Sequence, residues 1–272
     1  MTLSPRARWA LRLALAAVLA FMYLPLLLVL ANSFNSSRIF AWPPTSLTMH
    51  WWSAALESSG VRDAVVESLK VATVATIAAL VLGTMISFAV ARYTWFGRTT
   101  ISFLYVLPIA LPGIVTGVAL QNAFINVLSI GGFKIQLGFW TVVVGHVTFC
   151  IVVVFNNVVA RLRRSGHNLE EASMDLGAST VQTFRLVTFP QIRSALLAGG
   201  LLAFGLSFDE IIVTQLTAGA GIQTLPIWIF NNLARPNAAP LVNVVAAIVI
   251  LVSIIPVYLA QRLSDDPTHS RM

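Results

Sequence analysis

Charged residues are scarce in this sequence, and their scarcity excludes most soluble proteins. Asp, Glu, Lys and Arg together make up 10% of the 272 residues, while 57% of the residues are hydrophobic. Soluble globular domains carry about 25% charged residues. The mean hydropathy is +0.84. A chain of this composition is expected to be an integral membrane protein.

Cysteine is nearly absent as well. Cys150 is the single cysteine and lies within an apolar run, so one chain can form neither a disulfide framework nor a cysteine-based metal site. We expect Cys150 to be a small packing residue.

Catalytic motifs are also missing. The chain lacks a GxxxxGK[ST] phosphate loop, and no Ser/His/Asp set can be placed in it. His146 and the pair Asn156-Asn157 are expected to be hydrogen-bonded packing residues, because no other metal ligand lies at usable spacing. The sequence therefore predicts no catalytic residue, no metal site and no cofactor bound by this chain.

Apolar segments indicate an all-α membrane protein with six transmembrane helices in one domain, residues 1–272. The segments are 13–31 (with a kink expected at Pro25), 69–91, 101–127, 139–159, 195–217 and 241–259. Arg6 and its neighbours precede the first segment, which is long for a signal peptide and is expected to stay as an anchor.

The net charge of +7 is explained by orientation in the bilayer rather than by nucleic acid, because the basic residues flank the apolar segments. Both termini are then predicted to be cytoplasmic. On this topology twelve of the 17 basic residues are inside: Arg6, Arg8, Arg12, Arg92, Arg98, Arg161, Arg163, Arg164, Arg185, Arg193, Arg262 and Arg271.

Two irregular stretches qualify this pattern. Pro108, Pro112 and Gly113 in the third segment would free backbone carbonyls, so that segment should face protein or a pathway rather than lipid. Residues 32–66 are expected to form a polar, irregular outer loop whose Trp51-Trp52 pair marks a membrane interface.

Residues 161–190 are the long polar stretch between apolar segments in the second half. Asn168 with Glu171 is a candidate N-cap and capping box, with apolar residues at helical spacing up to Leu176, and Gly177 can end that helix. Ser179 with Gln182 predicts a second start, and Pro190 is expected to end that helix. Helices of about ten residues cannot cross a hydrocarbon core of about 30 Å. A docking element on the membrane surface or an ordinary helical loop would both fit.

Two adjacent carboxylates lie inside the fifth apolar segment. Asp209 and Glu210 would each cost at least about 2.5 kcal/mol in the membrane unless they are paired or hydrated, which makes them candidates for a solute pathway. Pairing with a basic residue of a neighbouring subunit is the alternative. At about 100° per residue, Glu210 shares a small-residue face with Gly199, Ala203, Ser207 and Thr214, and Asp209 points to a different face.

The polar stretch resembles the EAA signature of permease subunits in binding-protein-dependent ABC importers. Glu171 and Ala172, then Gly177, then Pro190 match the pattern EAA, three residues, Gly, nine residues, I-x-L-P. The chain departs from it at Ser173, Val187 and Phe189. The resemblance implies that the residues coupling transport to ATP hydrolysis are Glu171, Ala172, Asp175, Gly177 and Pro190.

Other segments extend the resemblance to the spermidine/putrescine (PotC-like) subfamily over nearly the whole chain. They are residues 108–113, 145–149, 207–210 and 224–226. The resemblance implies a type I ABC importer permease fold in the bacterial cytoplasmic (inner) membrane and half of a pathway for polyamines or a related small amine, with Ser207, Asp209 and Glu210 along it. It also implies a second permease subunit, two ATPase subunits carrying ATP-Mg, and an extracytoplasmic solute-binding protein.

Two other functional classes remain open from the residues alone. An ion-coupled secondary transporter of a small cationic solute should show inverted repeats and discontinuous helices in both halves. An intramembrane enzyme would need a nucleophile paired with a base, or metal ligands at helical spacing. Asp209 and Glu210 are adjacent and would face different sides of a helix, which speaks against the enzyme.

Overall fold

The computed structural model describes residues 4–38, 42–44, 46–94, 96–97, 111–127, 135–235 and 237–264, with side chains up to residue 254. Nearly all of the regular structure in these residues is helical, and an isolated bridge joins Asn35 and Leu47. The chain divides into two compact units, which are described separately: residues 1–62 with 228–257, and residues 63–227 with 258–272.

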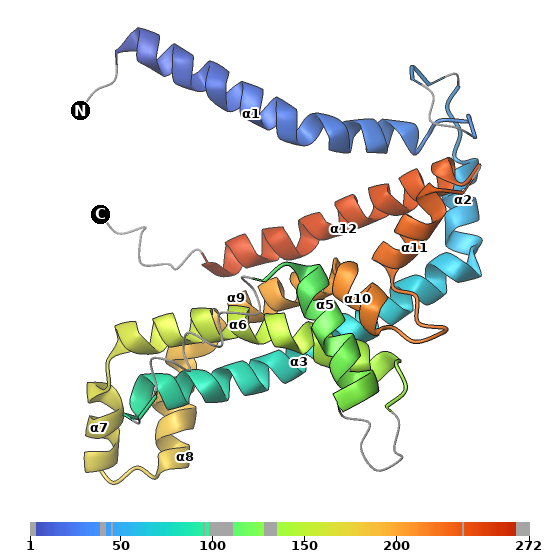
Figure 1. Cartoon of the computed structure of the whole chain (residues 1–272). Coiled ribbons are helices and arrows are strands. Elements are labelled where there is room, and N and C mark those ends of the chain that lie inside the picture. Colours follow the sequence, from blue (N-terminus) through green and yellow to red (C-terminus); the bar gives the residue numbers. More distant parts are fainter. Residues whose placement is uncertain are drawn as a thin grey trace. The chain divides into compact units, whose positions relative to one another are not determined.

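The first unit contains α1 (Pro5–Asn32), α2 (His50–Glu57) and most of α12 (Ala239–Ser264) (Figure 1). Helix α1 begins where Ser4 Oγ accepts a hydrogen bond from Ala7 N at 3.3 Å, with proline in the first turn. No residue of α1 is buried in the chain, and Pro25 lies inside it. The prediction that residues 32–66 are irregular is wrong for α2 and for the start of α3, because a helix satisfies their backbone groups internally.

The second unit holds most of the remaining helices. They are α3 (Ser59–Arg92), α5 (Gly113–Asn122), the π-helix η1 (Ala123–Val127), α6 (Phe139–Ser165), α7 (Asn168–Asp175), α8 (Thr180–Thr183), the π-helix η2 (Phe184–Thr188), α9 (Phe189–Phe208), α10 (Ile212–Thr217) and α11 (Leu225–Leu233), of which α3 and α11 cross the boundary between the units.

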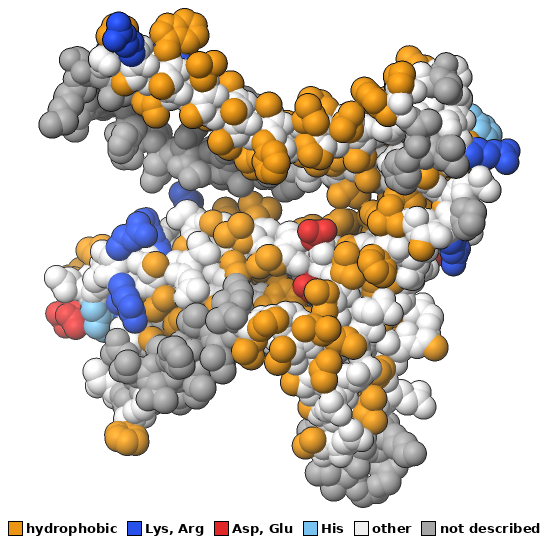
Figure 2. Space-filling model, turned by 45° about the horizontal axis from the view of Figure 1, so that its top comes forward, with side chains coloured by type: hydrophobic (Ala, Val, Ile, Leu, Met, Phe, Trp, Pro, Cys, Tyr) orange, Lys and Arg blue, Asp and Glu red, His pale blue; other side chains and the backbone are white. Residues whose placement is uncertain are grey.

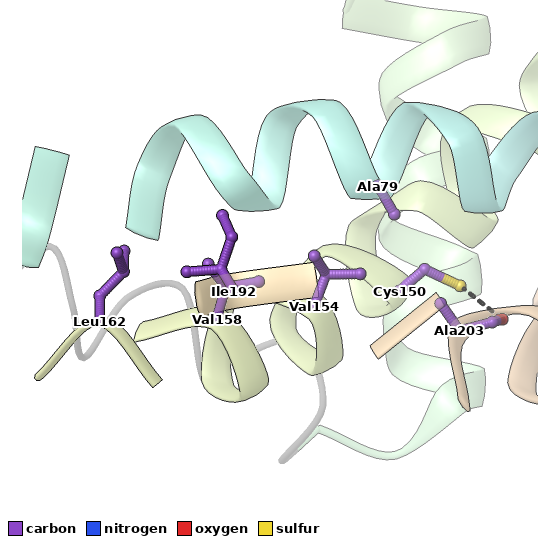
Figure 3. Packing of buried hydrophobic residues seen from close by; sticks show 7 residues of the cluster. All are labelled: Ala79, Cys150, Val154, Val158, Leu162, Ile192 and Ala203. Atoms are coloured by element: carbon purple, nitrogen blue, oxygen red, sulfur yellow. Dashed lines mark hydrogen bonds between the residues drawn. The ribbon is translucent and has the colours of Figure 1, made fainter. Parts of the chain in front are cut away.

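The core of the second unit lies where α3, α6 and α9 pack together (Figure 3). Its buried side chains are Ala79, Cys150, Val154, Val158, Leu162, Ile192 and Ala203. The approach of α6 and α9 is close, because a Cβ added at Gly199 would lie 3.3 Å from Val154 Cα. Cys150 is fully buried and its thiol donates to Ala203 O at 3.3 Å, which confirms it as a packing residue.

Four helical stretches are long and apolar enough to cross a membrane: α1, α3, α6 and residues 180–208. Two shorter apolar helices cover residues 113–127 and 239–254. Hydrophobic side chains cover much of the surface in Figure 2, as expected for helices that face lipid. The expected third segment falls partly on residues 101–110, which lie outside the described residues, and α5 begins directly after Pro112.

The fifth expected segment, residues 195–217, is not one continuous helix. Helix α9 starts earlier, at Phe189, and ends at Phe208, and α10 starts at Ile212. Four β-branched residues, Ile211 to Thr214, follow the interruption. Such residues have lower helix propensity, so tertiary contacts can interrupt the helix there at modest cost.

Candidate coupling site and helix interruption

Helix α7 confirms half of the predicted capping pattern. It ends in a Schellman motif, in which Gly177 N donates to Met174 O at 2.9 Å and Ala178 N donates to Ser173 O at 3.1 Å. Gly177 has φ +88°, a conformation that favours glycine. The prediction for the other end is wrong: Asn168 is the first helical residue, and the N-cap is His167, whose side chain makes no capping bond.

The second short helix starts as predicted, but Pro190 does not end it. Ser179 Oγ accepts from Gln182 N, and Gln182 Oε1 accepts from Ser179 N at 2.8 Å, which completes the capping box. The chain then stays helical through η2 into α9, so residues 180–208 form one long helical stretch. Phe189 N donates to Phe184 O, five residues back, and this wide turn leaves room for the proline ring at the start of α9.

A buried ion pair attaches α7 to the membrane helices. Glu170 Oε1 lies 2.8 Å from Arg92 Nη2, at the end of α3, and both side chains are about nine-tenths buried. Thr188 Oγ1 in η2 donates to the same carboxylate oxygen at 3.2 Å, and His167 Nδ1 lies 2.9 Å from Glu170 Oε2. Arg92 Nη1 also donates to Leu162 O, near the end of α6, at 3.3 Å. The Arg92–Glu170 pair therefore connects α3, α6, α7 and η2.

Sequence reasoning missed Glu170. It chose the neighbouring Glu171, which is exposed, and noted only that the apolar residues of α7 recur at helical spacing. Leu169 and Leu176 are 59% and 90% exposed, while the carboxylate of Glu170 is buried. The available signal was Arg92 itself, a basic residue at the end of an apolar segment that requires an anionic partner if it is buried.

The five residues expected to couple transport to ATP hydrolysis lie on the surface of this element. Glu171, Ala172, Asp175, Gly177 and Pro190 are all exposed. The apolar side chains of Leu176 and Val181 stand beside them, 90% and 75% exposed. Helices α7 and α8 project together beyond the ends of α3 and α6 in Figure 1. Exposed apolar side chains on a short polar element are typical of a protein–protein contact.

The interruption between α9 and α10 contains the two carboxylates singled out from the sequence. Asp209 is the C-cap of α9 and is exposed, whereas Glu210 is partly buried. Glu210 Oε1 accepts a hydrogen bond from Val213 N at 2.7 Å, so the carboxylate satisfies one of the free N–H groups at the start of α10. Among the described residues no basic side chain forms an ion pair with either carboxylate.

Ser207 and His146 lie next to this interruption. Ser207 is 3% exposed and its Oγ lies 2.7 Å from His146 Nδ1. His146 Nε2 lies 2.8 Å from Thr214 Oγ1, in α10. His146 is therefore a hydrogen-bonded residue, as predicted, and Asn157 likewise donates to Val153 O at 2.9 Å. In the described part of the chain no three His, Cys, Asp or Glu side chains are grouped as metal ligands.

Comparisons with known proteins agree on one family. Residues 79–267 match the family described as "Binding-protein-dependent transport system inner membrane component". The putrescine transport system permease protein PotI of Escherichia coli (strain K12) is 33% identical over 248 residues, covering 89% of this chain and 87% of PotI. The spermidine/putrescine transport system permease protein PotC of the same strain is 31% identical over 254 residues, covering 93% of each chain.

Solved structures show the same fold at low identity. A crystal structure of a bacterial alginate ABC transporter, in complex with an alginate pentasaccharide-bound periplasmic protein, contains a chain that matches with a TM-score of 0.74. The match is 13% identical and covers 96% of this chain and 95% of that one. At this identity the likeness concerns the fold alone.

Proposed function

Because this chain belongs to the family of binding-protein-dependent transport system inner membrane components, we propose that residues 161–190 are its docking element for an ATPase subunit. The chain is a multi-pass permease subunit of an ABC importer with the type I permease fold, located in the inner membrane. In such importers ATP is hydrolysed by a separate subunit. Family membership decides against the secondary transporter and the intramembrane enzyme.

The observation that carries the proposal is the buried Arg92–Glu170 pair under an exposed apolar surface. A helix of eight residues is marginal on its own in water, so α7 holds its shape through this pair and the bond from Thr188. A partner that pressed on Leu176 and Val181 would move the ends of α3, α6 and η2 together with α7. The proposed coupling residues Glu171, Ala172, Asp175, Gly177 and Pro190 would then lie at, or beside, the contact.

We test this assignment with two exposed leucines. Leu176→Asp places a charge on the proposed contact, and Leu47→Asp places one on a leucine of similar exposure, 76%, in the segment predicted to lie outside. We expect Leu176→Asp to lower copurification of the ATPase subunits at least tenfold, and Leu47→Asp to leave it unchanged. Retention of the ATPase by Leu176→Asp, or its loss in Leu47→Asp, would contradict the assignment.

For the solute, we propose that this chain forms half of a pathway for putrescine, spermidine or a related small amine. The support comes from the names of PotI and PotC and from two carboxylates at a helix interruption within an apolar unit, neither of which has a basic partner among the described residues. An anionic group in a low-dielectric region attracts an amine cation strongly. Asp209 and Glu210 are the proposed contacts, and Ser207 lies one turn earlier as a buried neighbour.

The proposed assembly follows from the same family. It contains a second, homologous permease subunit, two ATPase subunits that bind ATP-Mg, and an extracytoplasmic solute-binding protein. Closure of the ATPase pair would push α7, and the two permeases would then open the pathway to the other side. Six transmembrane spans with both termini in the cytoplasm are part of this proposal, and thiol labelling from each side of the membrane tests them.

A further inference from the structure

The interruption between α9 and α10 leaves backbone groups that a continuous helix would have satisfied. In the last turn of α9 the backbone C=O groups have no N–H donor within the helix, and in the first turn of α10 the backbone N–H groups have no C=O acceptor. In an apolar unit each unsatisfied group is costly. Val213 N is satisfied by the Glu210 carboxylate at 2.7 Å, and Glu210 O accepts from Thr214 Oγ1 at 3.0 Å. The interruption is therefore an ordered feature with its own bonds.

His146 spans this interruption from α6. Its Nδ1 lies 2.7 Å from Ser207 Oγ, in the last turn of α9, and its Nε2 lies 2.8 Å from Thr214 Oγ1, in the first turn of α10. The imidazole and the Thr214 side chain are fully buried. One side chain thus bonds to both interrupted ends.

The direction of these bonds follows from counting protons. Thr214 has one hydroxyl proton, and it is donated to Glu210 O. Thr214 Oγ1 must then accept from His146 Nε2–H, which leaves Nδ1 of a neutral imidazole as an acceptor for the Ser207 hydroxyl. The result is a continuous chain of hydrogen bonds: Ser207 to His146, His146 to Thr214, and Thr214 to the backbone of Glu210.

Helix α10 packs closely against α5 and α6 beside the imidazole. Gly145 precedes His146, and a Cβ added there would lie 2.9 Å from Val213 Cγ1. On its α5 side, α10 meets Gly117, where an added Cβ would lie 2.6 Å from Leu216 Cδ1. The absence of a Cβ at these two glycines therefore lets α10 lie close to both α5 and α6.

We propose that His146 is a positioning residue for transport: its imidazole clamps the ends of α9 and α10 and so fixes the backbone from which Glu210 presents its carboxylate. A residue serving only to fill space would not need both ring nitrogens bonded to hydroxyls on opposite sides of an interruption. The clamp is an inference about this chain's own helices, and its effect on uptake rests on the proposed polyamine pathway.

The test uses the complete importer in lipid nanodiscs with putrescine as the probe. We compare His146→Phe, which keeps a planar aromatic ring and removes both bonds, with His146→Gln, which keeps a donor and an acceptor. A second variant, Ser207→Ala with Thr214→Val, removes the same two bonds, together with the bond from Thr214 to Glu210 O, without changing the ring. Thr148→Val is the matched control, since Thr148 lies on α6 and bonds only locally, to Gly145 O.

Hydrogen exchange over residues 208–214 reads the clamp directly. We expect at least tenfold faster exchange in His146→Phe and in the Ser207/Thr214 double variant, a smaller increase in His146→Gln, and none in Thr148→Val. Putrescine uptake should fall at least tenfold in the first two variants and recover in part in His146→Gln.

The two readouts separate the inference from the function on which it rests. Unchanged exchange over residues 208–214 in the folded double variant would overturn the clamp. Faster exchange with unchanged uptake would uphold the clamp as a structural element, overturn its role in transport, and count against the pathway at Glu210. Faster exchange together with slower uptake supports both.

Discussion

Two glutamates, 40 positions apart in the chain, show how differently a carboxylate can be held in an apolar protein. Glu170 is buried and paired with Arg92, and it accepts from Thr188. Glu210 is partly buried and accepts from a backbone N–H, with no basic partner among the described residues. The first arrangement joins helices, since its charge is already neutralised. The second leaves a charge available to a cation.

The largest effect that tests this contrast is expected at the buried pair. Glu170→Leu or Arg92→Met alone leaves one buried charge unpaired and should destabilise the permease by about 3–5 kcal/mol, whereas the double variant should cost much less. Thermal unfolding of the purified complex measures the cycle. Lys70→Met, which breaks the exposed pair with Glu67, is the control and should cost no more than about 1 kcal/mol. If the destabilisation of the double variant equalled the sum of the two single effects, the result would contradict a stabilising interaction between Arg92 and Glu170.

At the other carboxylate the expected loss is in transport rather than stability. Glu210→Gln keeps an oxygen that accepts from Val213 N while removing the charge, and Glu210→Ala removes both. We expect both variants to lower putrescine uptake about tenfold, corresponding to about 1.4 kcal/mol, and Glu210→Ala alone to speed hydrogen exchange at Val213. If Glu210→Gln kept full putrescine affinity and uptake rate, the result would contradict a role for the Glu210 charge in the pathway.

The fold illustrates why some of these differences could be predicted and others could not. Apolar composition predicted the membrane helices, because contact with lipid and with the protein core both favour apolar side chains. The caps at Gly177 and at Ser179–Gln182 are local patterns, and the structure confirms them. The helix continues through Pro190 because of the π-helix at Phe184–Thr188, which no local sequence pattern predicts.

The interruption after Phe208 and the burial of Glu170 share one property. Each is bonded to a partner far away in the sequence, since His146 bonds to side chains on both sides of the interruption and Arg92 pairs with Glu170. Windows of neighbouring residues could not reveal these contacts. The sequence did identify Glu210 as unusual, from the cost of charge in an apolar segment.

A smaller effect is expected at the turn that ends α7. Gly177→Val forces a branched side chain into φ +88° and should cost about 1–2 kcal/mol in the docking element. Transport-coupled ATP hydrolysis should fall several-fold while membrane insertion stays normal. Gly205→Ala is the matched control, because that glycine lies on the exposed face of α9 with open space around it. An unchanged rate of uptake in Gly177→Val would contradict a role in coupling.

The smallest expected effect is at the capping box of α8. Ser179→Ala removes the acceptor for Gln182 N and should destabilise the element by about 1 kcal/mol, and Ser179→Asn should restore most of this loss. Limited proteolysis between α7 and α8 measures the difference. Both variants should leave putrescine affinity unchanged, because α8 belongs to the region of Glu170 and not to that of Glu210. A changed affinity would mean that the two regions are not separate.

The connections on the two sides of α7 and α8 are mechanically unequal. Between α6 and α7 the helical backbone is interrupted at Gly166 and His167, and Gly166 has φ +68°. On the far side residues 180–208 are an unbroken rod, whose α9 part alone is about 30 Å long at about 1.5 Å per residue. In the proposed assembly, a push from an ATPase subunit on this element would therefore be delivered along α9, which ends at Phe208, directly before Asp209 and Glu210.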